Sequence, residues 1–249
     1  MDRKEMICGR IYKAFLTYMD RETKKEKTRF LGGFPYETDP HDRHYDIPAA
    51  INLGTEFVLQ AMNGNGPVPD AIEAVKMYLK SLHFTNKHEL SENTESFLFK
   101  TMFCAPTKYV KTILDAGLDI NAVRCHPIYT DIKDYEAYPV LVYAAEVGDS
   151  EKVKALLENG ADKSFGATAA VLCAESTFAT PEQKIACFKQ LNNNGVDLLQ
   201  DDVLNQITPK EKEVFVWLQE AKRGYELSKK VSHHNKKEKL AEVANEKTR

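Results

Sequence analysis

One short pattern recurs three times in the chain and constrains its fold more than any other feature. Residues 110–121 read VKTILDAGLDIN, residues 153–164 read VKALLENGADKS, and residues 188–199 read FKQLNNNGVDLL. In each copy an apolar residue precedes Lys, a Leu follows shortly afterwards, and a Gly stands two positions before an Asp. Such recurrence predicts stacked helical hairpins, because each hairpin needs a neighbour to bury its single apolar stripe.

The spacing of the copies is typical of one kind of helical repeat. A weaker copy at residues 75–86, VKMYLKSLHFTN, has Leu82 at the Gly position. The marker positions 82, 117, 160 and 195 are 35, 43 and 35 residues apart, close to the roughly 33-residue period of a helix-turn-helix repeat. Val153, Leu156 and Leu157 share one helical face and predict an amphipathic second helix in the hairpin. The Gly that follows predicts a left-handed turn that ends this helix.

The segment at residues 139–164, PVLVYAAEVGDSEKVKALLENGADKS, resembles the ankyrin repeat over nearly its whole length. The positions that match the family pattern are Leu141, Ala144, Ala145, Gly148, Val153, Leu156, Leu157, Gly160, Ala161 and Asp162. Val142 stands where the family has a His that joins adjacent turns, so we expect looser hydrogen bonding between repeats. The resemblance covers about residues 55–200 and implies an all-α, ankyrin-type helical-repeat solenoid with about four repeats and helical caps.

The repeats predict the remaining domain organisation. The chain divides into four expected regions: an N-terminal helical cap and loop at 1–54, ankyrin-like repeats at 55–200, a C-terminal helical cap at 201–228, and a charged, disordered tail at 229–249. Within the first region we expect an amphipathic helix over 5–19 and a charged linker over 20–29. Residues 63–71, NGNGPVPDA, predict a Gly- and Pro-rich loop. The last clear repeat carries extra residues around 179–183.

The long spacing between Gly117 and Gly160 places its extra residues at 122–138, AVRCHPIYTDIKDYEAY. Ankyrin-like repeats extend their turns or hairpin fingers at this point, so we call residues 122–138 the predicted finger. Tyr129 and Tyr135 offer large amphipathic contact area at low entropic cost, as interface anchors do. The alternative is that these aromatic side chains fold back onto a groove of their own repeats.

The resemblance implies a non-catalytic protein–protein interaction module, because ankyrin-like solenoids bind partner proteins along a concave face of fingers and inner helices. The predicted partner-binding residues are Tyr129, Tyr135, His126, Phe103, Cys104, Glu146, Val147, Glu175 and Ser176. The last six are expected at exposed positions of the inner helices. We find no nucleophile elbow, phosphate loop, kinase signature or H-E-x-x-H pattern, so the sequence predicts neither an enzyme nor a cofactor.

Two alternative functions stay open. A divergent ankyrin-like protein with a Lys- and Glu-rich tail looks like the effectors that intracellular bacteria deliver into host cells, where they act by binding host proteins. The cluster of His41, Asp42, His44 and Asp46 suggests instead a small metal-dependent enzymatic head in the N-terminal region. We predict no metal site there, because the cluster lies in a Pro-containing loop without the helical i, i+4 geometry of zincins or a second ligand cluster elsewhere, and Asp46 fits a helix cap before Pro48.

Charge and composition exclude several classes of partner. The net charge of −3 supplies no basic field for binding nucleic acid. No apolar run reaches roughly 18 residues and the first ten residues lack an apolar signal core, so we expect no membrane span and a cytoplasmic protein, with export into a host cell as the alternative. The five cysteines are odd in number and form no C-x-x-C pair, which predicts reduced thiols.

Overall fold

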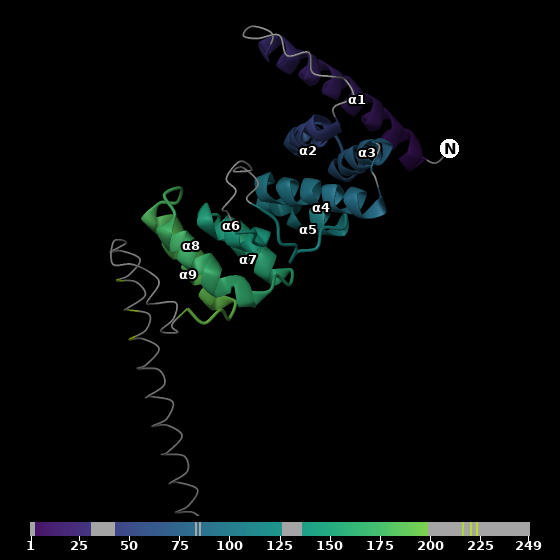
Figure 1. Cartoon of the computed structure of the whole chain (residues 1–249). Helices are drawn as coiled ribbons and strands as arrows, with labels where there is room; N and C mark the ends of the chain where they lie inside the picture. The colour runs from purple at the N-terminus through teal and green to yellow at the C-terminus, as the bar shows by residue number, and fades with distance from the viewer. Residues whose placement is uncertain are drawn as a thin grey trace, which may run out of the picture. The chain divides into compact units, whose positions relative to one another are not determined.

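The computed structural model of the chain describes residues 3–30, 43–82, 84, 86–125, 136–198, 216, 220 and 223. Within these residues the chain is mostly helical and has no β-strand, which confirms the predicted all-α class (Figure 1). The chain divides into two compact units. The first comprises Met1–Ala144 and Ala155–Asp162, and the second comprises Ala145–Lys154 and Lys163–Arg249.

The first unit begins with three helices around an aromatic cluster. Helix α1, Arg3–Phe30, packs on α2, Arg43–Gln60, and on α3, Val68–Ser81 (Figure 1). Phe15 of α1 is fully buried, and its ring centroid lies 5.0 Å from that of Phe57 and 5.4 Å from that of Tyr78. The ring contacts of buried Phe15 attach α1 to α2 and α3.

Two expectations for the N-terminal region are wrong. Helix α1 continues through residues 20–29, predicted to be a linker, because the Glu, Lys and Arg side chains of this stretch favour the helical backbone. Helix α2 already begins at Arg43, so Asp46 lies inside it and is not its N-cap. Pro48 lies inside the helix beyond its first turn, where it lacks the N–H for one backbone hydrogen bond. Helix α2 also runs through the predicted division after residue 54.

The connection between α2 and α3 is shorter than predicted. A segment η1, Ala61–Asn65, continues from α2 but is interrupted at Gly64, φ 102°, and α3 starts at Val68, so the end of the predicted loop 63–71 is helical. Pro67 precedes the first residue of α3, where a missing backbone N–H costs little. Helix α3 ends with Leu82 in an extended conformation, φ −73° and ψ 148°. Leu at the marker position therefore ends its helix differently from Gly.

Helix α4, Lys87–Cys104, packs against α2 and α3. Its N-cap is Asn86, whose side-chain oxygen accepts a hydrogen bond from the backbone N–H of Glu89 at 2.9 Å. A 3-10 turn, η2 at Thr107–Tyr109, leads into α5, Val110–Asp115, which contacts α4. The fully buried side chains Phe97, Phe99 and Met102 place the centre of the first unit at the second half of α4.

The three Gly-x-Asp copies share one turn geometry, as predicted. Gly117, Gly160 and Gly195 have φ of 104°, 96° and 85°, values that side chains with a Cβ disfavour. The N–H of Ala161 donates to the carbonyl of Leu156 at 3.0 Å, and the equivalent pair after α9 repeats this bond. These bonds satisfy the last carbonyls of each helix. The repeated pattern therefore codes for a repeated helix end.

Helices α6, Val140–Glu146, and α7, Ser150–Glu158, follow the predicted finger. None of the seven residues of α6 is more than 8% exposed, which is the behaviour of a helix surrounded by other structure. Val153, Leu156 and Leu157 of α7 are buried and confirm the predicted apolar stripe. Gly148 turns the chain between the two helices with φ 77°.

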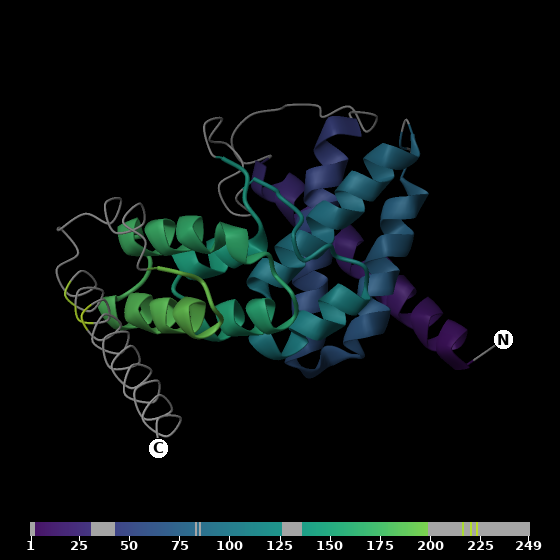
Figure 2. The ribbon, with the colours of Figure 1, turned by 90° about the horizontal axis from the view of Figure 1, so that it is seen from below.

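The second unit contains η3, Lys163–Phe165, then α8, Gly166–Glu175, and α9, Pro181–Asn193, which lie side by side (Figure 2). Thr180 and Gln183 cap the start of α9 by accepting each other's backbone N–H bonds. The extra residues at 179–183 thus build a helix start. Cys173 of α8 and Cys187 of α9 are fully buried.

The predicted C-terminal cap at 201–228 and tail at 229–249 lie outside the described residues, apart from the helical backbone at Val216, Glu220 and Arg223.

Candidate functional site

The residues predicted to bind a partner fall into three groups. Tyr129, Tyr135 and His126, at the centre of the predicted finger, lie outside the described residues. Cys104 and Glu175 are exposed, as expected, and Val147 is half-buried. Phe103, Glu146 and Ser176 are buried, so their predicted exposure is wrong.

Two of the three buried residues, Phe103 and Ser176, have a structural reason for their burial, and the third, Glu146, is buried at a desolvation cost. Phe103 is a large apolar side chain, and burying it is worth about 1.5–3 kcal/mol. The hydroxyl of Ser176 accepts a hydrogen bond from the N–H of Phe178 at 3.0 Å and shapes the turn after α8. Burial raises the pKa of the Glu146 carboxyl, because desolvation disfavours its charged form. Phe103 and Ser176 thus contribute to the fold, whereas the charged form of Glu146 is disfavoured, and all three side chains offer little contact area to a partner.

The structure describes both ends of the predicted finger and shows that they meet. Arg124 and Tyr138 form an antiparallel β-bridge. The N–H of Arg124 donates to the carbonyl of Tyr138 at 3.2 Å, and the N–H of Tyr138 donates to the carbonyl of Arg124 at 3.0 Å. The chain therefore leaves and re-enters the helical unit at one point, and the intervening residues are closed off at their base.

Tyr143 of α6 lies directly against this bridge. Its hydroxyl is 2.9 Å from the carbonyl oxygen of Arg124 and 3.2 Å from that of Glu136, and it accepts a hydrogen bond from the N–H of Tyr138 at 3.2 Å. Its ring packs edge-on against Tyr138 and against Phe99 of α4. One side chain thus touches both strands of the bridge.

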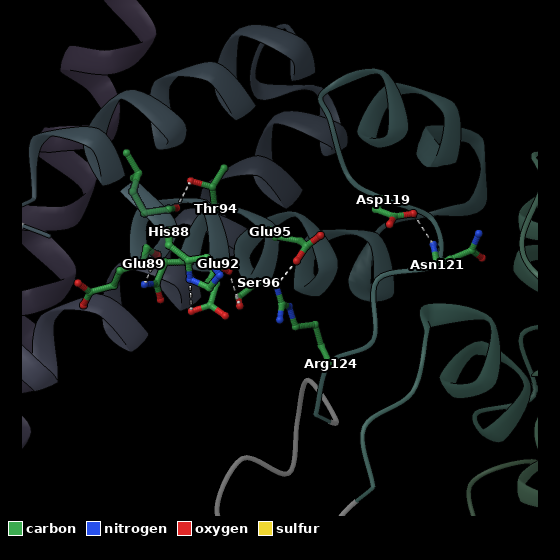
Figure 3. A network of polar contacts seen from close by, with 11 residues as sticks. His88, Glu89, Glu92, Thr94, Glu95, Ser96, Asp119, Asn121 and Arg124 are labelled. Atoms are coloured by element: carbon green, nitrogen blue, oxygen red, sulfur yellow. Dashed lines mark hydrogen bonds and ion pairs between the residues drawn. The ribbon is translucent and has the colours of Figure 1, made fainter. Parts of the chain in front are cut away.

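An ion pair from helix α4 also contacts the bridge between Arg124 and Tyr138. The guanidinium of Arg124 forms an ion pair and hydrogen bond with the carboxylate of Glu95, and Figure 3 shows the two side chains directed toward each other. Both side chains are less than a third exposed. The bridge is therefore attached to α6 through Tyr143 and to α4 through Glu95.

Polar contacts continue along the turns of the first unit. The side-chain oxygen of Asp119 accepts the backbone N–H of Asn121 at 2.9 Å (Figure 3). The side-chain oxygen of Asn121 accepts the N–H of Asp162 at 2.8 Å, which links two successive Gly-x-Asp turns. Val142, at the family's His position, is fully buried. Looser bonding between repeats remains a prediction.

The outer side of the bridge carries an acidic and aromatic pair. The hydroxyl of Tyr138 donates to the exposed carboxylate of Glu136, and this bond raises the pKa of Tyr138 to about 12, with burial and the carboxylate charge adding to the shift. Tyr138 thus stays a neutral hydrogen-bond donor at physiological pH. Val123, which precedes Arg124 in the chain, is 43% exposed. Apolar and polar contact area lie together here, which suits protein recognition.

The described residues give no support to the alternative of a metal-dependent head. His41 and Asp42 lie outside the described residues, and the backbone of His44 and Asp46 is helical within α2. Among the described residues no group of three or more His, Cys, Asp and Glu side chains could hold a metal ion. In the same part of the chain, no helix has the length and apolar character needed to span a bilayer.

Sequence reasoning missed the residues that build the finger base. Tyr143 lies in the apolar run VLVYAAE, and nothing in this run separates a hydroxyl with partners from a ring that only fills space. Glu95 lies 29 residues before Arg124, so their pairing depends on the fold. The excess length between Gly117 and Gly160 did locate the segment.

Comparisons with known proteins supply no family for this chain. No protein-family model matches it, and neither a curated protein nor a solved structure is detectably similar to it. The assignment to ankyrin-type repeats therefore rests on the residues and turns described above.

Proposed function

We propose that the protein is a non-catalytic interaction module of divergent ankyrin-type repeats, and that it binds a partner protein through the predicted finger. The observation that carries this proposal is the closed base formed by Arg124 and Tyr138. A segment whose two ends are held together by backbone bonds loses less entropy when it binds than a free loop does.

Three features support the repeat assignment. The glycine turns after α5, α7 and α9 share one left-handed geometry. Each follows the second helix of a hairpin, at the position where the family pattern has its Gly-x-Asp motif. The hydrogen bond from Asp162 to Asn121 joins two successive turns, as stacked repeats require.

Burial removes three inner-helix residues from the proposed binding surface, and Cys104, Glu175 and Val147 stay proposed beside the finger. Phe103, Glu146 and Ser176 are withdrawn from the proposed site because a partner reaches little of their surface. Tyr129, Tyr135 and His126 remain its proposed anchors, since aromatic side chains dominate binding hot spots. The exposed residues Val123 and Glu136 at the finger base supply the adjoining rim.

The test uses the full chain. The partner is recovered by affinity purification from the native cell, and its dissociation constant is then measured for the wild type and for Tyr129→Ala/Tyr135→Ala. We expect the double variant to bind at least about tenfold more weakly, a loss of about 1.4 kcal/mol. Phe178→Ala is the control, because Phe178 is a 53% exposed aromatic residue outside the finger.

The control should bind within about twofold of the wild type, a change below about 0.5 kcal/mol. Equal affinity of the wild type and the double tyrosine variant for every recovered partner refutes the finger as the binding element. An equal loss in Phe178→Ala assigns binding to a surface other than the finger.

A further inference from the structure

The hydroxyl of Tyr143 is a polar group within the buried run 140–145 of helix α6, whose other side chains are apolar. Tyr143 is 1% exposed, and the residues on either side of it in α6, Val142 and Ala144, are equally buried. Its ring centroid lies 6.2 Å from that of Phe99 and 6.1 Å from that of Tyr138. A phenylalanine ring fills this space equally well, so packing alone does not account for a tyrosine here.

The hydrogen bonds of the hydroxyl give it a specific task. It accepts the N–H of Tyr138 at 3.2 Å and lies within donating distance of the carbonyl oxygens of Arg124, 2.9 Å, and Glu136, 3.2 Å. Arg124 lies near the start of the predicted finger, and Glu136 and Tyr138 lie at its end. The single hydroxyl therefore contacts the backbone on both sides of the closure.

Burial makes these contacts selective. Because Tyr143 is 1% exposed, water has little access to its hydroxyl, and the geometry that keeps the bonds of the hydroxyl to the bridge is favoured. The ion pair between Glu95 and Arg124 acts on the same strand from α4. Because both side chains of that pair are partly exposed, it constrains the closure less than the buried hydroxyl does.

We propose that Tyr143 is the positioning residue of the predicted finger: its buried hydroxyl joins both ends of the finger to helix α6 and fixes the direction in which the finger leaves the repeats. This inference rests on the proposed function for its biological meaning. The positioning itself is a property of the free protein and is measurable without a partner.

The first measurement is hydrogen exchange of single backbone amides by NMR in Tyr143→Phe. Loss of the hydroxyl should raise the exchange rates of the Tyr138 and Arg124 amides about tenfold, the effect of removing one buried hydrogen bond. Tyr109→Phe is the matched control, because the Tyr109 hydroxyl also donates to a backbone carbonyl, that of Met62 at 2.9 Å, away from the finger. The control should leave both bridge amides within about twofold of the wild type, and both variants should keep native helix content.

Unchanged exchange rates of the Tyr138 and Arg124 amides in Tyr143→Phe overturn the proposal. An equal rise of these rates in Tyr109→Phe overturns it as well. If Tyr143→Phe does not fold, the wild type decides: the Tyr138 amide must exchange far more slowly than an unstructured peptide, and exchange at the unstructured rate overturns the proposal.

Partner binding separates positioning from the proposed function. With a recovered partner, Tyr143→Phe should bind about three- to tenfold more weakly because the finger is less preorganised, while Tyr109→Phe binds normally. Faster bridge exchange with unchanged affinity overturns the role of Tyr143 in binding. Unchanged affinity in Tyr129→Ala/Tyr135→Ala instead refutes the proposed function. In that case the amide exchange rates of Tyr143→Phe still test whether Tyr143 positions the finger.

Discussion

Replacing Gly160 by Ala tests whether the recurrent glycine sets the end of each repeat helix. Gly160 has φ 96°, and a Cβ built on it would meet no atom within 4 Å. The cost of Gly160→Ala is therefore a backbone cost without a steric clash against neighbours. A residue with a Cβ in the left-handed region pays about 1–2 kcal/mol, so we expect the free energy of unfolding to fall by that amount.

Two further variants separate backbone strain from packing. Gly160→Asn should lose less than Gly160→Ala, because Asn tolerates the left-handed conformation better. Gly148→Ala should lower the free energy of unfolding by at least ~1 kcal/mol more than Gly160→Ala does. Gly148 also has a left-handed backbone, φ 77°, and in addition its new Cβ would lie only 2.7 Å from the Cβ of Ala179. Among the three variants, Gly160→Asn should thus be the most stable, Gly160→Ala intermediate and Gly148→Ala the least stable.

The assay is urea unfolding followed by far-ultraviolet circular dichroism, with the slope of the transition compared among variants to confirm that the same surface unfolds. If the turn were relaxed in solution, Gly160→Ala would instead gain about 0.4–1 kcal/mol by reducing the entropy of the unfolded chain. A midpoint equal to or above that of the wild type refutes the left-handed turn.

Three other changes have defined outcomes. Leu156→Ala, at a 1% exposed position, should cost about 2–5 kcal/mol in urea unfolding, and a loss under about 1 kcal/mol contradicts its burial. The raised pKa of Glu146 makes the native state bind its proton more tightly than the unfolded state, so this residue lowers stability as pH rises above the unfolded pKa. Glu146→Gln should therefore raise stability at neutral pH relative to stability at acidic pH in thermal unfolding, and an unchanged pH dependence contradicts the shift. A hydrogen bond with Cys173 and burial raise the pKa of the Cys187 thiol, which makes this thiol unreactive in the native state. Ellman's reagent should therefore label exposed Cys104 rapidly and should label buried Cys173 and Cys187 only after unfolding. Rapid native labelling of all three contradicts the packing of α8 on α9.

The sequence predicted the parts of this protein that depend on local geometry. A glycine two positions before an aspartate ends a helix in the left-handed region at each of its three copies, so Gly117, Gly160 and Gly195 could be recognised from the chain alone. The spacing of Val153, Leu156 and Leu157 likewise predicted the buried stripe of α7. The extra length between two of these glycines located the predicted finger.

Local sequence patterns failed to predict the boundaries of two helices in the N-terminal region. The stretch at 20–29 has many charges but strong helix formers, and α1 simply continues through it. Asp46 followed by Pro48 looked like a helix start, yet α2 begins at Arg43. A helix start depends on which residues its neighbours bury, and this information lies in α1 and α3.

Exposure was decided by the tertiary structure alone. The chain determines that α6 is apolar, but whether Glu146 faces solvent depends on what surrounds that helix, and the structure buries it. The same holds for the finger base: Glu95 and Tyr143 come from different helices and meet Arg124 only because the fold brings α4 and α6 to it. Local backbone preferences act between neighbours in sequence, whereas burial and pairing act between neighbours in space. For that reason the sequence determined the recurrent glycine turns, while the fold decided which side chains are exposed.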